Sequence, residues 1–137
     1  MKLKLLLDTN ILLDLVLERP PFCTQASRIF RHIEQGNIDG FITATTITDI
    51  FYIIRKAQGR DLALAAIKHL LQHLKICAVD QKTIQAAIDL ELKDFEDSIQ
   101  LACANLSQLD GIVTRNGKDF VTSSLPIYSP TELLNTL

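Results

Sequence analysis

The stretch Leu3-Lys4-Leu5-Leu6-Leu7-Asp8-Thr9-Asn10 decides the fold, because a short apolar run ends in a carboxylate and two small polar residues. This pattern is typical of a buried parallel strand that is followed by a loop. Short apolar runs over residues 38–42, 75–79 and 111–114 predict three more strands, and residues 126–128 predict an edge strand. We therefore expect a mainly parallel sheet of about four to five strands.

Helical patterns separate these predicted strands. In the intervening segments apolar residues recur every three to four positions, which is the spacing of one helix face. Gly59 ends one segment, Asp80 is an expected N-cap, and Ser129-Pro130-Thr131-Glu132 is a strong helix start. The predicted helices cover residues 11–17, 22–34, 43–57, 61–74, 80–92 and 95–107, with a last short helix after residue 129. Strands that alternate with helices predict a three-layer α/β fold, in which helices flank the sheet.

Composition limits the class of protein. With 137 residues, 47% of them hydrophobic, the chain is expected to form one domain over residues 1–137 with a substantial core. No apolar run reaches the ~18 to 20 residues that span a bilayer, and Asp8 interrupts the apolar N-terminus too early for a signal peptide. Three cysteines without a C-x-x-C motif indicate buried thiols in a reducing compartment, so we expect a cytoplasmic protein.

The net charge is −2 and the isoelectric point is near 5.9. A protein that binds nucleic acid by overall charge would be strongly basic, so this class is excluded. Binding of RNA or DNA would then need a local basic patch or a metal ion.

Several carboxylates are placed to meet at one edge of the predicted sheet. Asp8 follows the first strand, the loop 114–119 follows the fourth, and Asp49 and Asp94 or Asp97 lie near the starts of helices. Ligands bind at this edge in open parallel sheets. Gathered carboxylates repel one another, and Mg²⁺ or Mn²⁺ relieves the repulsion because these ions prefer oxygen ligands. The expected chemistry is phosphodiester hydrolysis, with metal-activated water.

Each of these acids also has a simpler interpretation. Asp8 is suited to start a turn or to cap a helix, and Asp119 to be an ordinary helix-start acid. Thr46-x-x-Asp49 matches a variant capping box, and Asp94 is suited to cap the helix that contains Asp97. The case for a metal site therefore rests on the joint placement of the acids.

Four blocks of the sequence, residues 5–14, 42–50, 93–100 and 112–120, resemble the four motifs of the PIN-domain family. They occur in the family order and at family-like spacing over essentially the whole chain. The resemblance implies a PIN fold and an endoribonuclease that depends on Mg²⁺ or Mn²⁺ and hydrolyses single-stranded or structured RNA. It also implies the role that many members have, the toxin of a VapC-type pair with a small antitoxin protein.

Carried over to this sequence, the resemblance implies a catalytic set of Asp8, Asp49, Asp97 and Asp119. Of these, Asp8, Asp97 and Asp119 are the expected metal ligands. Asp49 departs from the family, which more commonly has Glu there, so its shorter side chain is expected to reach the metal through water. The expected supporting residues are Asn10, Asp94, Thr114 and Asn116.

Basic and apolar residues suggest further contacts. Arg55, Lys56, Arg115 and Lys118 are candidate RNA contacts, although charged pairs commonly form a solvated face. His69 and His73 have helical spacing, but no Glu lies between them as in H-E-x-x-H, so we expect surface residues. Residues 47–54 are apolar over more than one helix face, which predicts a homodimer.

Two other functions fit parts of the same pattern. A phosphatase of the haloacid-dehalogenase type also places its nucleophile after the first strand, but it requires Asp-x-Asp, and this chain has Asn10. A non-catalytic PIN-like module that binds RNA or protein is the main alternative, and the complete acidic set argues against it.

Overall fold

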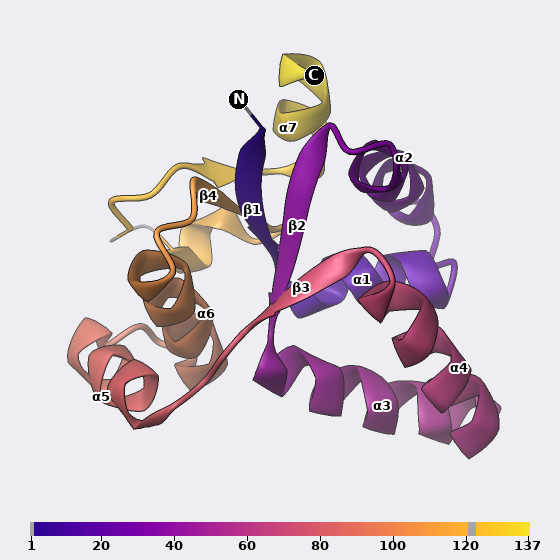
Figure 1. Ribbon diagram of the computed structural model, residues 1–137, viewed down its shortest axis with the longest axis horizontal. Coiled ribbons are helices and arrows are strands. Elements are labelled where there is room, and N and C mark those ends of the chain that lie inside the picture. The colour runs from indigo at the N-terminus through magenta and orange to yellow at the C-terminus, as the bar shows by residue number, and fades with distance from the viewer. Residues whose placement is uncertain (1, 121–122) are drawn as a thin grey trace.

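A parallel sheet forms the centre of the computed structural model, which describes residues 2–120 and 123–137 (Figure 1). The strand order is β3-β2-β1-β4-β5, and each neighbouring pair is parallel. The strands are β1 (Leu3–Leu7), β2 (Ile38–Thr43), β3 (Leu74–Cys77), β4 (Gly111–Val113) and β5 (Ile127–Tyr128). The prediction of a parallel sheet with an edge strand after residue 126 is therefore confirmed.

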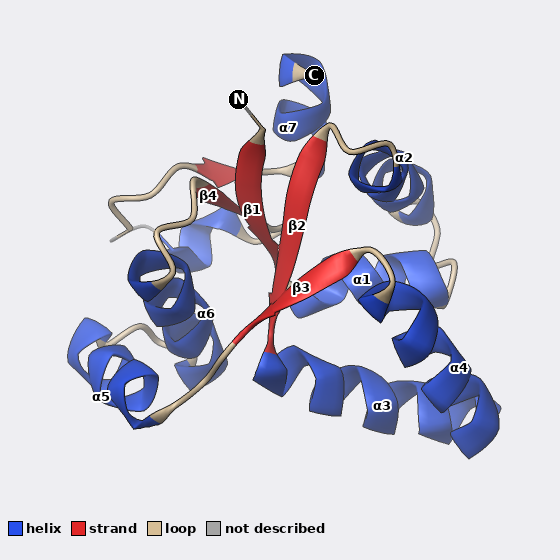
Figure 2. Cartoon of the chain, viewed as in Figure 1, coloured by secondary structure: helices blue, strands red, loops and turns tan. Residues whose placement is uncertain are grey.

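Helices cover both faces of this sheet (Figure 2). Two separate hydrophobic clusters contain their buried side chains, one with α1, α2, α3, α4 and α7 and the other with α5 and α6. The helices are α1 (Thr9–Val16), α2 (Cys23–Glu34), α3 (Ala44–Gln58), α4 (Arg60–Leu71), α5 (Gln81–Leu90), α6 (Phe95–Leu106) and α7 (Pro130–Thr136), with a short 3₁₀ helix η1 (Gly117–Phe120). The three-layer α/β fold is confirmed.

The position of β1 in the centre of the sheet explains the three consecutive leucines at residues 5–7. Leu5 and Leu7 belong to one hydrophobic cluster, whereas Leu6 belongs to the other. Successive side chains of a strand point to opposite faces of the sheet, so a strand covered on both faces is apolar at every position. All three leucines are almost fully buried.

The segment around Leu74 differs from the prediction. The helix expected over residues 61–74 ends at Leu71, and Leu74 is the first residue of β3, which ends at Cys77 rather than at residue 79. Leu74 pairs with Gly40 of β2, and a Cβ at residue 40 would lie 2.7 Å from the Leu74 Cδ2 atom. The absence of a side chain at Gly40 lets Leu74 pack into the core from a strand, a pairing that helical periodicity does not reveal.

Helix ends follow the predicted signals in most places. Ser129 and Glu132 form a reciprocal capping box at the start of α7, and Asp80 caps α5. The start of α3 is different, because Thr43 caps it by accepting a hydrogen bond from the Thr46 amide. The capping-box interpretation of Thr46-x-x-Asp49 was therefore wrong. Among the described helices, none combines the length and the apolar composition needed to cross a membrane.

Candidate functional site

A pocket of about 370 Å³ lies at the carboxyl ends of β1 and β4 and is lined by acids from four parts of the chain. All four acids of the predicted catalytic set line it, together with two more carboxylates. The acids are Asp8, Asp49, Asp94, Glu96, Asp97 and Asp119, and the remaining lining residues are Thr9, Asn10, Leu13, Ile53 and Asn116. None of the described Lys or Arg side chains lines this acidic pocket.

The topology accounts for this convergence. Asp8 directly follows β1, and Asp119 lies in η1, shortly after the neighbouring strand β4. Asp49 lies in the first half of α3, which directly follows β2 on the other side of β1. Parallel strands end at one edge of a sheet, so the segments after them meet there. The first turn of α6 adds the remaining acids.

Asp8 is the most enclosed of these acids, with only 6% of its surface exposed. Its two carboxylate oxygens have separate donors. The Gln100 amide donates to Oδ1 at 3.2 Å, and the Thr114 hydroxyl donates to Oδ2 at 2.8 Å. These bonds fix the orientation of the carboxylate, and Thr114 is one of the residues that the sequence predicted to support the site.

Threonine hydroxyls connect the elements beneath the acids. The Thr9 hydroxyl lies 2.9 Å from that of Thr46 and donates to Glu96 Oε1 at 3.2 Å. The Thr46 hydroxyl in turn lies 3.1 Å from that of Thr43, the cap of α3. This buried network ties the starts of α1, α3 and α6 to one another.

Two acids at the start of α6, Asp94 and Asp97, have different roles in the helix. Asp94 is the N-cap, and its Oδ1 accepts from the Asp97 amide at 3.2 Å. Asp97 uses only its backbone in this bond, so its carboxylate remains available to the pocket. Asp94 therefore caps the helix that contains Asp97, as the simpler interpretation of this residue predicted.

Burial and neighbouring acids disfavour the ionisation of two of these side chains, Asp97 and Glu96. Burial, followed by the charges of Asp94, Asp8 and Asp119, raises the pKa of Asp97 to about 7. Burial, followed by a hydrogen bond with Asp49 and the charge of that residue, raises the pKa of Glu96 to about 7. The pocket is therefore an uncompensated region of negative charge.

The donor set suits a hard divalent cation. Carboxylate oxygens are the preferred ligands of Mg²⁺ and Mn²⁺, and Mg²⁺ usually keeps several waters while using only one or two carboxylates. Within residues 2–120 and 123–137, no group of three or more Asp, Glu, His or Cys side chains is placed to hold a metal ion. A hydrated cation with few direct carboxylate ligands is therefore the kind of ion that this open acidic pocket suits.

Sequence reasoning missed Glu96 and Gln100 as parts of the site. Both lie on α6, one helical turn apart, and Gln100 is 1% exposed within an otherwise apolar stretch of that helix. A buried amide in such a stretch is the signal that would have identified it, because buried polar groups need partners.

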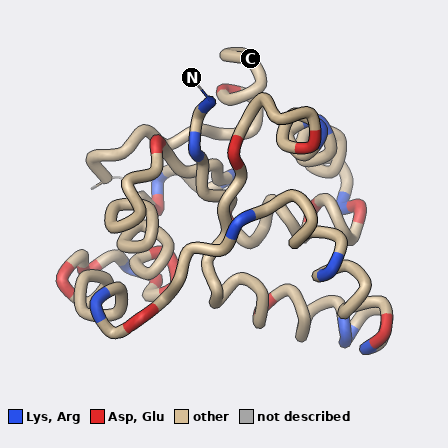
Figure 3. The backbone as a smooth tube through the Cα atoms, in the orientation of Figure 1, with Lys and Arg blue, Asp and Glu red and all other residues tan. Residues whose placement is uncertain are grey.

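The candidate RNA contacts do not line the acidic pocket. Arg55 and Lys56 are exposed in the last turns of α3, and Figure 3 shows basic residues gathered there beside the start of α4. Lys118 is exposed next to Asp119. Arg115 differs from the expectation of a free phosphate contact, because its guanidinium binds the buried Asp14 carboxylate at 2.8 Å.

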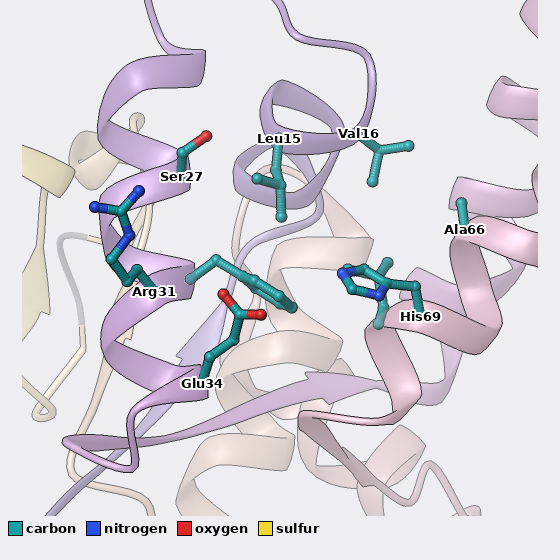
Figure 4. A pocket seen from close by; sticks show the side chains of 9 residues that line it. Leu15, Val16, Ser27, Arg31, Glu34, Ala66 and His69 are labelled. Carbon is teal, nitrogen blue, oxygen red and sulfur yellow. The ribbon is translucent and has the colours of Figure 1, made fainter.

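A second cavity of about 410 Å³ lies between α1, α2 and α4, and none of the predicted acids lines it (Figure 4). His69 lies at its edge, and the rings of His69 and His73 both pack against Phe30, with centroids 5.8 and 5.6 Å from it. His73 also lies 3.7 Å from Glu34. These histidines take part in packing between helices.

Comparison with known proteins gives consistent matches. The sequence model of the PIN domain matches residues 4–118. None of the curated protein sequences compared with the chain matches it.

Solved structures of toxins, some of them in complexes with antitoxins, share the fold. A VapBC2 complex from Rickettsia felis, bound to a promoter DNA fragment, matches with a TM-score of 0.72 and 18% identity over 93% of this chain and 98% of that one. A toxin–antitoxin complex from Klebsiella pneumoniae matches with a TM-score of 0.69 and 27% identity over 91% and 96%. The sarcin–ricin loop cleaving toxin VapC20 of Mycobacterium tuberculosis matches with a TM-score of 0.70 and 12% identity over 86% and 94%.

Proposed function

Because the chain belongs to the PIN domain family, we propose that it is an endoribonuclease that depends on Mg²⁺ or Mn²⁺ and hydrolyses RNA phosphodiester bonds. The observation that carries this proposal is the pocket lined by six carboxylates and by none of the described basic side chains. Such a pocket is costly to an empty protein and suits a bound cation.

Asp8, Asp97 and Asp119 are the proposed metal ligands. Asp8 follows β1, Asp119 lies in η1 after β4, and Asp97 lies in the first turn of α6, and all three line the pocket. Asp49 faces the same space from α3 and is proposed to act through water, because it is one methylene shorter than Glu. When bound, the cation supplies activation of water and stabilisation of the leaving oxygen.

The chain's other residues set the position of this acidic set. Thr114 and Gln100 hold the Asp8 carboxylate, and the Asp94 cap fixes the first turn of α6. Asn10 and Asn116 line the pocket with amide groups that can donate to phosphate oxygens. Asn10 takes the position of the second acid that a haloacid-dehalogenase phosphatase requires, so the hydrolase we propose is not of that type.

We also propose that the protein is the toxin of a VapBC-type pair, acts in the cytoplasm, and has a small antitoxin protein as its partner. The Rickettsia felis structure is a VapBC2 complex and the Klebsiella pneumoniae structure is a toxin–antitoxin complex, and they cover 93% and 91% of this chain. A protein that cleaves RNA in the compartment where it is made needs such control. Its cysteines are all free thiols, which suits a reducing compartment.

A homodimer is part of the proposal. Ile50 and Ile54 of α3 are buried in the core, whereas Tyr52 and Ile53 are 58% and 41% exposed on the same helix. An apolar surface beyond the core face needs a partner. A two-fold dimer through α3 would place Arg55 and Lys56 of one protomer where RNA bound at the partner's pocket could reach them.

The direct test is incubation of purified protein, shown to be folded and free of antitoxin, with RNA and Mn²⁺. Cleavage that stops on addition of a chelator and returns with excess Mn²⁺ is the expected result. If the folded protein binds RNA but never cleaves it under these conditions, the chain is a non-catalytic PIN-like module instead.

A further inference from the structure

The buried carboxylate of Asp14 is not used by the proposed reaction. Asp14 lies in α1 and is 1% exposed. Arg115 binds it with two bonds, Nε to Oδ2 at 2.8 Å and Nη2 to Oδ1 at 3.2 Å, and Arg19 Nε donates to Oδ1 at 2.9 Å. Burying an ion pair has a large desolvation cost, so its presence requires an explanation other than simple stability.

Arg115 joins this ion pair to the acidic pocket through the backbone. It lies between Thr114, which holds Asp8, and Asn116, which lines the pocket. The Asn116 amide donates to the Thr114 hydroxyl at 3.0 Å, and the Asp119 amide donates to the Asn116 carbonyl at 2.9 Å. The loop over residues 114–119 is therefore a short chain of bonded groups that ends at the fourth acid.

The side chain of Arg115 does not line the acidic pocket, although that of the next residue, Asn116, does. Its guanidinium lies 3.8 Å from the centroid of the Phe22 ring, and 24% of the side chain is exposed. Contact with an aromatic face and a bidentate carboxylate fixes a guanidinium in one plane. The backbone at residue 115 is thereby anchored to α1 through its side chain.

We propose that Asp14 is a positioning residue, which acts through Arg115 to hold the 114–119 loop so that Asn116 and Asp119 face the acidic pocket. The inference rests on the proposed function for what the pocket binds. Asp119 is itself exposed, so its place depends on that of its loop.

The helix α1 connects Asp8 of the acidic pocket with Asp14, the partner of Arg115. Asp8 is the N-cap of α1, and Asp14 follows it in the next turns of that helix. Because a helix rises 1.5 Å per residue, the two acids are about 9 Å apart along its axis. One rigid element therefore sets the first acid of the pocket directly and the fourth through Arg115.

The test uses Arg115→Lys, which keeps the charge beside Asp14 but replaces a two-pronged contact with a single donor. Asp14→Asn is less suitable, because it leaves two arginines without their buried partner and is expected to impair folding. Ile67→Val, a change in the core under α4, is the control for a general loss of stability. Hydrogen exchange of residues 114–120 is measured without metal, and Mn²⁺ affinity by titration calorimetry.

We expect faster exchange of residues 114–120 in Arg115→Lys but not in Ile67→Val, and about tenfold weaker Mn²⁺ binding. In an Asp119→Asn background, Arg115→Lys should weaken Mn²⁺ binding much less, because both changes act on the same contact. Unchanged loop exchange, or unchanged Mn²⁺ affinity, would overturn the inference. A wild-type protein that binds no Mn²⁺ would contradict the proposed function instead, and loop exchange would still decide whether Arg115 anchors the loop.

Discussion

The environment of Asp97 indicates that this residue has a functional role. Its carboxylate is not needed to cap α6, because Asp94 does so, and burial together with the neighbouring acids raises its pKa to about 7. A side chain kept in an unfavourable environment without a structural task is a candidate for function. The same reasoning applies to Glu96, whose pKa is raised to a similar value.

Replacement of Asp97 should therefore separate activity from stability. Asp97→Asn removes one of the repelling charges but keeps the size of the side chain and the backbone bond to Asp94. We expect RNA cleavage to be lost and the metal-free melting temperature at pH 8 to be equal to or above that of the wild type. Calorimetry measures the melting temperature, and a variant that melts well below the wild type would make Asp97 a structural residue.

The raised pKa values also predict how metal-free stability depends on pH. Between the ordinary pKa of Asp97, 3.8, and its folded value of about 7, the folded state binds more protons than the unfolded state. Stability contributed by this group is therefore lost as the pH rises through that window. Glu96 acts in the same direction.

We expect the metal-free wild type to lose melting temperature between pH 5 and pH 8 relative to Asp97→Asn, measured under the same conditions. Mn²⁺ should reduce this difference, because a bound cation favours the ionised carboxylates. Parallel pH profiles of the two proteins would contradict the assigned cause.

At the scale of elements, local patterns predicted the structure well where they depend on near neighbours. The apolar run of β1 and the Ser129–Glu132 box of α7 lie where the sequence placed them. Leu74 was misplaced because its partner, Gly40, is far away in the sequence. Its burial is decided by a strand pairing rather than by helical spacing.

The candidate site was likewise predictable where local patterns decide it and not where contacts between distant residues do. The acids after strands were identified because sheet topology brings strand ends together. The bonds of Gln100 to Asp8 and of Arg115 to Asp14 join residues that are 92 and 101 positions apart. No local pattern contains such partners, so the roles of these two side chains required the structure.

The close pairing of β2 and β3 can be tested with glycine substitutions. In Gly40→Ala the new methyl group would lie 2.7 Å from Leu74 Cδ2 and 2.8 Å from Ile33 Cδ1. We expect a loss of about 1–3 kcal/mol in the free energy of unfolding, measured in urea, because overpacking forces these side chains to shift.

Gly117→Ala is the matched control, because the nearest atom to its new methyl group lies at an ordinary 3.7 Å. We expect it to change the free energy of unfolding by much less than Gly40→Ala. Equal effects of the two substitutions would mean that the contact with Leu74 is not the cause.

At the scale of the whole molecule, two faces of α3 have different tasks. Ile50 and Ile54 complete the core, whereas Tyr52 is largely exposed, with its ring 5.1 Å from that of Phe51. A two-fold interface is self-complementary, so a residue at its centre faces its own copy. A charge placed there would be repelled by the same charge on the partner.

Tyr52→Glu should therefore produce monomers without loss of helix content. Light scattering gives the mass in solution, and circular dichroism gives the helix content. Leu62→Glu, at an exposed position on α4, is the control for an added surface charge. A wild type that is monomeric at micromolar concentration would refute the dimer.

The acidic pocket and the cavity between α1, α2 and α4 differ in their place and in their lining residues. The pocket in Figure 4 lies between helices and contains mainly packing side chains, whereas the acidic pocket lies at the sheet edge. The acidic pocket is a place where the sequence concentrates charge against its own stability. We propose that RNA hydrolysis takes place in this pocket.

The most direct test of that claim compares the rates at which the wild type, Asp8→Asn and Asp61→Asn cleave one RNA in Mn²⁺, after identical purification. Asp8 lines the acidic pocket, whereas Asp61 is exposed on α4. We predict that Asp8→Asn lowers the rate at least about 100-fold, since metal sites depend on each ligand and its support, and that Asp61→Asn keeps the wild-type rate. Equal cleavage by the wild type and Asp8→Asn would contradict the claim.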